Sequence, residues 1–291
     1  MLQSEPEERV YGNLNMSLML LLRGGGDLAS GIALRLHHAG IHLIIIELPE
    51  PLVVRRFVSF AEAVFRDEFT VEDVTARLVS NIPNALAPPE QGYIPVLVDP
   101  QMKSLLELRA TVAKDTPIVL IDCRMMKRPP DTSLASADFV IGLGPGYIAA
   151  KNCHTAIETN RGHSLGRVIW QGAPEANTGI PESVNNHKSE RVLRSPSDGM
   201  LIVHADIGDH LEKDQIVAEV NSRPILAPFK GVLRGLLHPG IRVWKGQKIG
   251  DVDPRDDPRY CTLVSDKSLA IGGGVLEAIL SRPDLRPHIW D

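Results

Sequence analysis

A short pattern of residues occurs twice between residues 193 and 255, and it constrains the fold of this segment more than any other feature of the chain. In both copies, Pro-x-x-Gly precedes a short apolar run and a second motif, Gly-x-x-φ-x-Lys-x-Gln, in which φ is apolar. The residues Pro196, Gly199, Gly208, Lys213, Gln215 and Val220 recur, each 32 positions later, as Pro228, Gly231, Gly240, Lys245, Gln247 and Val252. Glycine forms the tight turns that short antiparallel strands need. Two copies that pair with each other therefore predict a small, flattened β-sandwich.

This repeat resembles the biotinyl/lipoyl type of domain, which is a barrel-sandwich hybrid. Domains of that type carry a modifiable lysine in the hairpin between the two copies. The corresponding hairpin here runs from Glu219 to Pro224 and contains no lysine, and the guanidinium of Arg223 cannot form the amide that biotin or lipoate needs. The resemblance implies the fold, and the missing lysine argues against biotin and lipoate.

The chain before the repeat predicts a Rossmann-like α/β domain with a mostly parallel sheet. Residues 18–23 form an apolar run that ends at three glycines, residues 27–39 have the apolar spacing of a helix, and residues 42–47 form a second apolar run. A strand, a helix and a strand within about 30 residues form a βαβ unit. Further strands are predicted at residues 94–99, 118–122, 139–142, 156–159 and 167–171, a helix at 101–113, and partly helical structure at 57–79. This alternation indicates an open, doubly wound sheet through about residue 175.

Shifts in composition divide the chain into five predicted segments. These are a disordered tail at 1–16, the Rossmann-like domain at 17–175, a linker at 176–192, the barrel-sandwich hybrid domain at 193–255, and a C-terminal segment at 256–291 whose helix is expected to pack on the first domain. The linker is rich in Pro, Gly, Asn and Ser, which is typical of an irregular connection.

Charge and composition argue against several classes of partner. The chain has 31 Lys and Arg against 36 Asp and Glu, and only 4% of its residues are aromatic, so a nucleic acid is not expected as a partner. No apolar run approaches the ~20 residues of a membrane helix, and no membrane association is expected. Three widely spaced cysteines without a Cys-x-x-Cys pair predict neither a disulfide framework nor a metal site, and they suit a cytoplasmic protein.

The turn after the first strand is the candidate for nucleotide binding. It matches Gly-x-Gly-x-x-Ala at a strand-to-helix junction, where backbone N–H groups and the helix N-terminus can hold a diphosphate. Its candidate binding residues are Gly24, Gly25, Gly26 and Asp27. Glu47, at the end of the second strand, is expected to accept a hydrogen bond from a ribose and to favour an NAD-like ligand over NADP. The negative charge of Asp27, only partly offset by Arg23, keeps a ligand-free scaffold open as the alternative.

Loops after three later strands are expected to reach the same side of the sheet. In an open α/β sheet, the carboxyl ends of the strands face the ligand crevice. Arginine forks match phosphate oxygens and glycine leaves room for them, so these loops predict a site for a small anion. The candidate residues are Arg124, Lys127, Gly142, Gly144, Gly146, Glu158, Asn160 and Arg161. A solvated basic turn and a turn-rich surface connection are the alternatives.

Candidates for a catalytic group are scarce. No nucleophile and base stand at a spacing that predicts catalysis. Cys123 is a weak candidate, because the neighbouring cation Arg124 would lower the pKa of its thiol. The alternative is a small thiol buried in the core.

From about Leu18 onward, the sequence resembles the YqeB family. The matching stretches are LLRGGGDLASGIALRLHHAG, RRFVSFAEAVF, IGLGPGY, IETNRGHSLGRVI, NTGIP and SDKSLAIGGGVLEAIL. Members of that family are accessory proteins of the selenium-dependent molybdenum hydroxylase system, and they are distantly related to the XdhC/CoxI proteins, which help to mature molybdenum enzymes. The resemblance implies a maturation factor that binds the molybdenum cofactor or a nucleotide in its crevice and acts on a partner hydroxylase.

Two alternatives stay open beside the maturation factor. One is an NAD-dependent oxidoreductase, with Glu47 on the ribose and a hydride acceptor near Gly144–Gly146. The other is a non-enzymatic scaffold whose sandwich docks a partner hydroxylase. The lack of a nucleophile–base pair favours the maturation factor and the scaffold. The sequence leaves open whether the protein is an enzyme and whether it forms a homo-oligomer.

Overall fold

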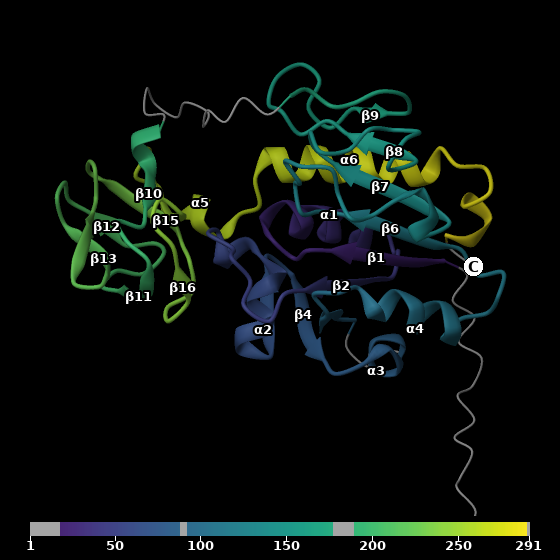
Figure 1. Ribbon diagram of the computed structural model, residues 1–291, viewed down its shortest axis with the longest axis horizontal. Helices are drawn as coiled ribbons and strands as arrows, with labels where there is room; N and C mark the ends of the chain where they lie inside the picture. Colours follow the sequence, from purple (N-terminus) through teal and green to yellow (C-terminus); the bar gives the residue numbers. More distant parts are fainter. Residues whose placement is uncertain (1–17, 88–91, 177–188, 290–291) are drawn as a thin grey trace, which may run out of the picture.

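A large mixed sheet with helices and a smaller all-β domain make up the protein (Figure 1). The computed structural model describes residues 18–87, 92–176 and 189–289. The predictions for the tail at 1–16 and for most of the linker at 176–192 lie outside the described residues.

The large sheet has nine strands in the order β3-β4-β5-β2-β1-β6-β7-β8-β9. Their bounds are β1 (Met19–Arg23), β2 (Leu43–Glu47), β3 (Glu68–Val71), β4 (Val74–Val79), β5 (Ile94–Val98), β6 (Ile118–Asp122), β7 (Phe139–Leu143), β8 (Thr155–Ile157) and β9 (Val168–Ile169). All neighbours from β4 to β8 pair in parallel, whereas β3 and β9 pair antiparallel at the two edges. The central strands are continuous apolar runs because helices cover both faces of the sheet. The mostly parallel α/β sheet expected from the sequence is confirmed.

Helices cover both faces of this sheet, and one further short helix, α5 (Arg259–Thr262), contacts β15 (Gly231–Leu236) of the smaller domain. The helices are α1 (Asp27–His38), α2 (Ala63–Arg66), α3 (Ile82–Leu86), α4 (Lys103–Thr111), α5 (Arg259–Thr262) and α6 (Asp266–Leu280), and 3-10 turns lie at Arg56–Val58, Phe60–Glu62, Leu134–Ser136, Ser189–Arg191 and Arg286–His288. α1 and α6 share one apolar core with the sheet, and α3 and α4 share another. The expectation of partly helical structure at 57–79 agrees with the 3-10 turns and α2 up to Arg66, whereas the rest of this region forms the hairpin of β3 and β4. In β4, buried Val74 and Ala76 alternate with partly exposed residues, which is the period of a strand.

The helix near the C-terminus, α6, lies alongside α1 (Figure 1). Small residues allow this close approach. A Cβ on Gly31 would lie 2.4 Å from the Cβ of Ser268, and a Cβ on Gly272 would lie 2.9 Å from the carbonyl oxygen of Gly31. α6 therefore supports α1, the helix whose N-terminus follows the glycine turn.

The smaller domain consists of two four-stranded antiparallel sheets, β10-β17-β15-β12 and β14-β13-β11-β16. Its strands are β10 (Val192–Arg194), β11 (Gly199–Val203), β12 (His210–Leu211), β13 (Ile216–Val220), β14 (Arg223–Leu226), β15 (Gly231–Leu236), β16 (Arg242–Val243) and β17 (Lys248–Asp253). Each sheet combines both copies of the repeat, because β16 pairs with β11 and β12 pairs with β15. Asn221 and Ser222, with φ of 51° and 58°, form the two-residue turn between β13 and β14.

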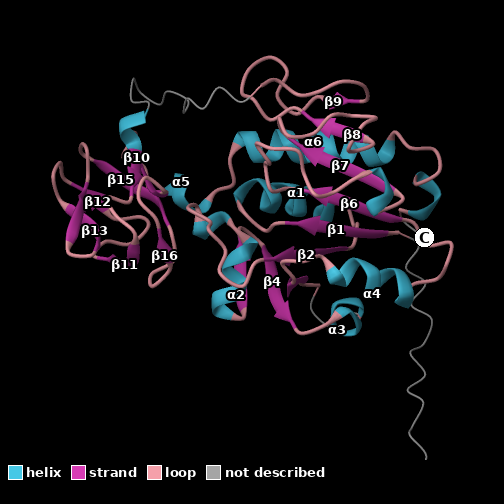
Figure 2. Cartoon of the chain, viewed as in Figure 1, coloured by secondary structure: helices cyan, strands magenta, loops and turns pink. Residues whose placement is uncertain are grey.

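The smaller domain lies at the carboxyl ends of the parallel strands, and the arrows of β1, β2 and β7 point towards it (Figure 2). Residues 54–56 of the larger domain form hydrogen bonds with β15 of the smaller domain. The backbone N–H of Leu236 donates to the carbonyl of Val54 at 2.8 Å, and Arg56 Nε donates back to the carbonyl of Leu236 at 2.7 Å. The loops that follow the parallel strands are thus on the side of the sheet where the second domain docks.

Candidate functional site

The glycine turn between β1 and α1 is held by the protein's own groups. The N–H of Gly25 donates to Glu47 Oε2 at 2.6 Å, and the N–H of Leu48 donates to Glu47 Oε1 at 2.7 Å. The carbonyl oxygen of Gly25 accepts from the backbone N–H of Ala61 at 2.9 Å, and a Cβ added to Gly25 would lie 3.0 Å from the nitrogen of Ala61. Burial raises the pKa of Glu47, against the lowering effect of these two N–H groups. The carboxylate expected to bind a ribose is therefore also the acceptor for the backbone of the turn.

The N-terminus of α1 stands beside an arginine that the sequence did not single out. Gly26 is the N-cap and offers no side chain, while the N–H of Leu28 bonds to Asp27 Oδ1 at 3.0 Å. Arg55 Nη1 lies 3.6 Å from Asp27 Oδ2. The negative charge foreseen at Asp27 is thus only partly offset by Arg55, which comes from the segment that contacts the smaller domain.

Two neighbouring arginines at this domain interface carry incompletely balanced charge. Arg55, 11% exposed, donates to the carbonyls of Tyr260 and Leu263 at 3.1 and 3.2 Å, but its buried Nε has no hydrogen-bond partner among the described residues. Arg234 of β15 is 14% exposed, and burial, followed by the charge of Arg55, lowers its pKa to about 10. The contacts of Arg234 with acids are long, at 3.7 Å to Asp253 and 4.0 Å to Asp251.

Those two aspartates have closer partners. Arg191 Nη2 lies 2.6 Å from Asp251 Oδ2, and Arg255 bonds to both oxygens of Asp253 at 2.9 and 2.5 Å. Arg234 therefore shares acids that are already paired, which explains why burial of its charge dominates its pKa. An anion placed between Arg55 and Arg234 would compensate both guanidinium groups.

The predicted anion ligand Arg124 is instead part of a neutral cluster at the ends of β1 and β6. Arg124 donates to both oxygens of Asp122 at 2.8 and 2.6 Å and to Asp131 at 2.5 Å. Arg23 donates to both oxygens of Asp131 at 2.9 Å. Hydrogen bonds from Arg23, opposed by burial and reinforced by Arg124, hold the pKa of Asp131 well below its usual range. Two arginines and two aspartates cancel, so in this conformation Arg124 has little charge left for a ligand.

The thiol of Cys123 is buried, which corrects the expectation of a reactive cysteine. Burial raises its pKa well above the usual value, and the charges of Asp122 and Glu47 raise it further. The guanidinium of Arg124 points to Asp122 and does not outweigh these effects. The structure therefore favours the alternative, a small thiol in the core.

The glycines after β7 make room for packing. A Cβ on Gly142 would lie 2.1 Å from the ring of Tyr147, and a Cβ on Gly146 would lie 2.3 Å from the carbonyl oxygen of Met126. Gly144, with φ of 82°, lies against Met125 and Thr159, so the loops after β6, β7 and β8 do meet. The convergence predicted from strand polarity is present, but these glycines face protein atoms.

The polar candidates after β8 are also engaged. The buried carboxylate of Glu158 accepts from the N–H groups of Thr159, Asn160 and Glu175 at 2.7, 2.6 and 2.7 Å. The side chain of Asn160 donates to Glu175 Oε2 at 2.6 Å.

Arg161 pairs with Asp266 at the start of α6, with Nη2 at 2.6 Å from Oδ1. This hydrogen bond, opposed by burial, lowers the pKa of Asp266 to about 2. Lys127 is exposed. The predicted pair of arginines thus does not form a vacant pocket, because Arg124 and Arg161 each bind a carboxylate.

The described residues contain neither a cluster of metal ligands nor a helix that could span a membrane. No group of three or more His, Cys, Asp or Glu side chains there is arranged to hold a metal ion. None of the helices in that part of the chain has the length and apolar character needed to cross a bilayer.

Comparison with known proteins finds a relative that is similar over most of this chain. No family model matches the chain. It is 45% identical over 262 residues, 90% of its length, to the uncharacterized protein YqeB of Escherichia coli (strain K12), which supports the resemblance to the YqeB family. The match covers 47% of that protein, so the chain spans about half the length of this relative.

Solved structures show only distant likeness. An aspartoacylase family protein from Mesorhizobium loti covers 29% of this chain and 32% of its own, with 17% identity and a TM-score of 0.21. The product-bound ectoine utilization protein EutE (DoeB) from Ruegeria pomeroyi covers 81% and 85%, with 13% identity and a TM-score of 0.26. These values are too low to carry a functional conclusion.

Proposed function

We propose that the protein is an accessory factor in the maturation of selenium-dependent molybdenum hydroxylases, and that it binds a phosphate-bearing ligand between its two domains. The ligand would be the molybdenum cofactor or a nucleotide. The resemblance to the YqeB family supports the role. The observation that carries the site is the pair of buried guanidinium groups, Arg55 and Arg234, beside the N-terminus of α1.

Electrostatics explain why a phosphate suits this position. A helix N-terminus carries a partial positive charge and turns its N–H groups outward. Two poorly balanced arginines in a region of low dielectric strengthen that preference. A phosphate oxygen would give the Nε of Arg55 its missing acceptor and would take the place of Asp27 as a partner.

The residues fit the phosphate of the molybdenum cofactor as well as that of a nucleotide. The orphaned Nε of Arg55 is a buried donor that calls for an anionic acceptor, and the pterin of the cofactor carries one phosphate group. When bound, the cofactor would supply the metal chemistry of the recipient hydroxylase. The part of this chain would be to bind the phosphate, through Arg55 and Arg234, and to hold it away from bulk water.

An NAD-dependent oxidoreductase has less support. Glu47, the residue expected on the ribose, is bonded to Gly25 and Leu48 at 2.6 and 2.7 Å. Any movement of this carboxylate towards a ribose that broke these bonds would cost about 1–3 kcal/mol for each backbone donor left unpaired. A terminal phosphate at the domain interface has no such requirement.

A scaffold role has a specific observation in its favour, and we retain it as the second candidate. Five large apolar side chains on one side of the smaller domain are between 41% and 54% exposed: Met200, Ile202, Ile216, Leu226 and Trp244. Four of them lie on the neighbouring strands β11, β13 and β14. We also propose that this domain is a barrel-sandwich hybrid of the biotinyl/lipoyl type without a prosthetic group, which docks the partner hydroxylase through this face.

One experiment tests the ligand. The full chain is purified, denatured, and its released small molecules are identified by mass spectrometry, in parallel with an Arg234→Gln variant. We expect a pterin phosphate or a nucleotide with the wild type and a clear loss with the variant, whose long contacts predict little structural damage. If nothing is released and titration with ATP, CTP and NAD gives no heat, the phosphate site is wrong. The scaffold is then tested by co-purification with a molybdenum hydroxylase.

A further inference from the structure

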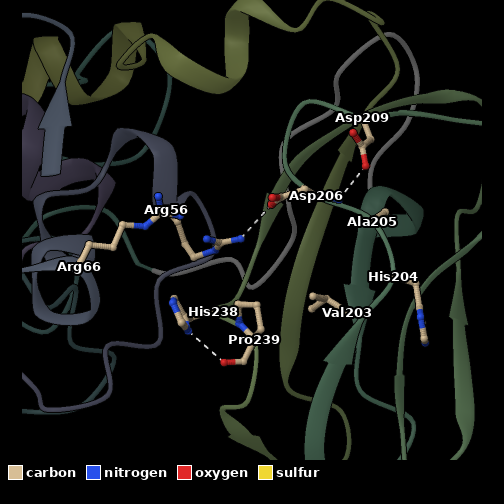
Figure 3. Close-up of a pocket in the computed structure, with 9 residues that line it drawn as sticks. All are labelled: Arg56, Arg66, Val203, His204, Ala205, Asp206, Asp209, His238 and Pro239. Atoms are coloured by element: carbon tan, nitrogen blue, oxygen red, sulfur yellow. Dashed lines mark hydrogen bonds and ion pairs between the residues drawn. The ribbon is translucent and has the colours of Figure 1, made fainter.

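A cavity of about 440 Å3 lies between α2 and the loops that follow β11 and β15 (Figure 3). It is lined by charged groups of both signs. Arg56 and Arg66 come from the larger domain, and Asp206 and Asp209 come from the smaller one. None of the residues assigned above to the phosphate site lines it.

The arginine wall has one side chain with unused donors. Arg66 Nε donates to Glu62 Oε1 at 2.9 Å, and its guanidinium carbon lies 5.5 Å from the ring centre of Phe69. Its two terminal nitrogens bond to no described residue, and the side chain is 47% exposed. The guanidinium is therefore oriented by protein groups while its fork is available to an oxyanion.

The aspartate wall has unused acceptors. Asp209 Oδ2 accepts from the N–H of Asp206 at 2.7 Å, and Asp206 Oδ1 accepts from the N–H of Ile207 at 2.8 Å. The second oxygen of each carboxylate has no hydrogen bond within the described part of the chain. These two oxygens suit an ammonium group, which carries several donors.

Arg56 fixes the distance between the two walls. It is 4% exposed, and it bonds to the carbonyl of Leu236, to Glu62 at 3.2 Å and to Asp206 at 3.3 Å. Figure 3 shows this side chain reaching across to Asp206. Each of its three guanidinium nitrogens donates to a protein oxygen, so Arg56 holds the two sides of the cavity together, and the more exposed Arg66 is the better placed to bind a ligand.

His238 adds an acceptor between the walls. Its ring stacks on Phe65 with centres 3.9 Å apart and planes at 11°. Nδ1 lies 3.0 Å from the carbonyl of Pro239, and because a carbonyl can only accept, Nδ1 carries the hydrogen. In the neutral ring, Nε2 is then an acceptor, which again suits a donor group of the ligand.

We propose that this cavity binds a small zwitterion of the amino-acid class, with its carboxylate on Arg66 and its ammonium group on Asp206 and Asp209. An anion alone would gain Arg66 but face two aspartates, and a cation alone would gain the aspartates but face two arginines. Only a molecule that carries both charges is attracted by both walls. The volume lies within the range of about 300–1,000 Å3 that is common for small-molecule sites. This inference is independent of the phosphate site.

Isothermal titration of the full chain tests the proposal. The probes are individual L-amino acids, each compared with its N-acetyl and its amide derivative, which remove one charge. We expect at least one free amino acid to bind, with both derivatives at least tenfold weaker. Arg66→Gln and Asp209→Asn should each weaken binding at least tenfold.

Arg77→Gln is the matched control. Arg77 also pairs with a glutamate, Glu68, at 2.7 Å, and stacks on an aromatic ring, Tyr93, at 4.6 Å, but it lies outside the cavity. The Arg77→Gln variant should bind the amino acid with the affinity of the wild type. Absence of binding at millimolar probe overturns the proposal. Equal binding of the N-acetyl or amide derivative, or unchanged affinity in Arg66→Gln, overturns it as well.

Discussion

The three consecutive glycines of α6 are expected to respond to alanine with opposite signs. They have ordinary helical backbone but different surroundings. A Cβ on Gly273 would meet no atom within 4 Å, one on Gly272 would lie 2.9 Å from the carbonyl oxygen of Gly31, and one on Gly274 would lie 2.1 Å from the carbonyl oxygen of Gly166. The exchange of glycine for alanine in a helix stabilises by about 1 kcal/mol when the site has space.

The net effect at each position follows from these distances. Gly273→Ala should raise the free energy of unfolding by about 0.5–1 kcal/mol. At Gly274 the obstacle is a backbone oxygen that cannot rotate away, and overpacking of this kind costs about 1–3 kcal/mol or more. That cost exceeds the gain in propensity, so Gly274→Ala should lower the free energy of unfolding by at least about 1 kcal/mol. The change in the free energy of unfolding for Gly272→Ala should lie between those of the other two variants.

Thermal unfolding followed by circular dichroism is the assay. A change of 1 kcal/mol shifts Tm by about 1.5–2 °C in a chain of this size, so the variants are resolvable. Gly273→Ala is the internal control, because it adds the same methyl group to the same helix. A similar Tm for all three variants would refute the close packing of α6 on α1 and on the loop at Gly166.

The remaining predictions concern the carboxyl edge of the sheet. Arg161→Ala should lower the free energy of unfolding by less than about 1 kcal/mol at pH 7, since its ion pair is partly exposed. Because the pKa of Asp266 is lowered to about 2, this loss should shrink as the pH falls from about 4 through 2, and a loss that grows in acid would contradict the pairing. Native Cys123 should resist iodoacetamide at pH 8 and react only after unfolding, because burial raises its pKa, and rapid native labelling would refute its placement. Glu47→Gln should lower the free energy of unfolding in urea by about 1–3 kcal/mol, because an amide has a single oxygen, whereas Glu47 accepts from Gly25 and Leu48 through two, and an unchanged stability would argue against this role.

The sheet was predictable where burial dominates the residue pattern. β1, β2, β6 and β7 are short apolar runs between turns, and the structure has strands at each of them. The constant offset of the repeat predicted paired antiparallel strands, and two antiparallel sheets that combine both copies are present. The hairpin of β3 and β4 was missed, because its few apolar residues alternate over too short a distance to separate a strand from a helix.

The site was predictable in position but not in its charge balance. Strand polarity brought the loops at Gly144 and Thr159 together as expected. The partner of Arg161, however, is 105 residues away, on a helix whose packing no local pattern specifies. Arg55 and Arg234 acquire their significance only because two domains bury them side by side. RRFVSFAEAVF, the stretch that contains Arg55, was a signal of family resemblance, but its sequence alone assigns no role to either arginine.

The carboxylates at the strand ends show why an anion is the ligand best suited to this edge. Glu47, Asp122 and Glu158 end or follow β2, β6 and β8, and each already accepts hydrogen bonds from the protein's own donors. A ligand that offers donors would therefore meet carboxylates whose charge is already shared with donors of the protein. The opposite requirement is found in Arg55, whose buried Nε has no acceptor among the described residues, and in Arg234, whose contacts with Asp251, Asp253 and the carbonyl of Tyr260 are all 3.5 Å or longer. Arg55 comes from the larger domain and Arg234 from the smaller all-β domain, so an anion bound to both would also strengthen the contact between the domains. Ligand binding and domain orientation are therefore expected to be coupled.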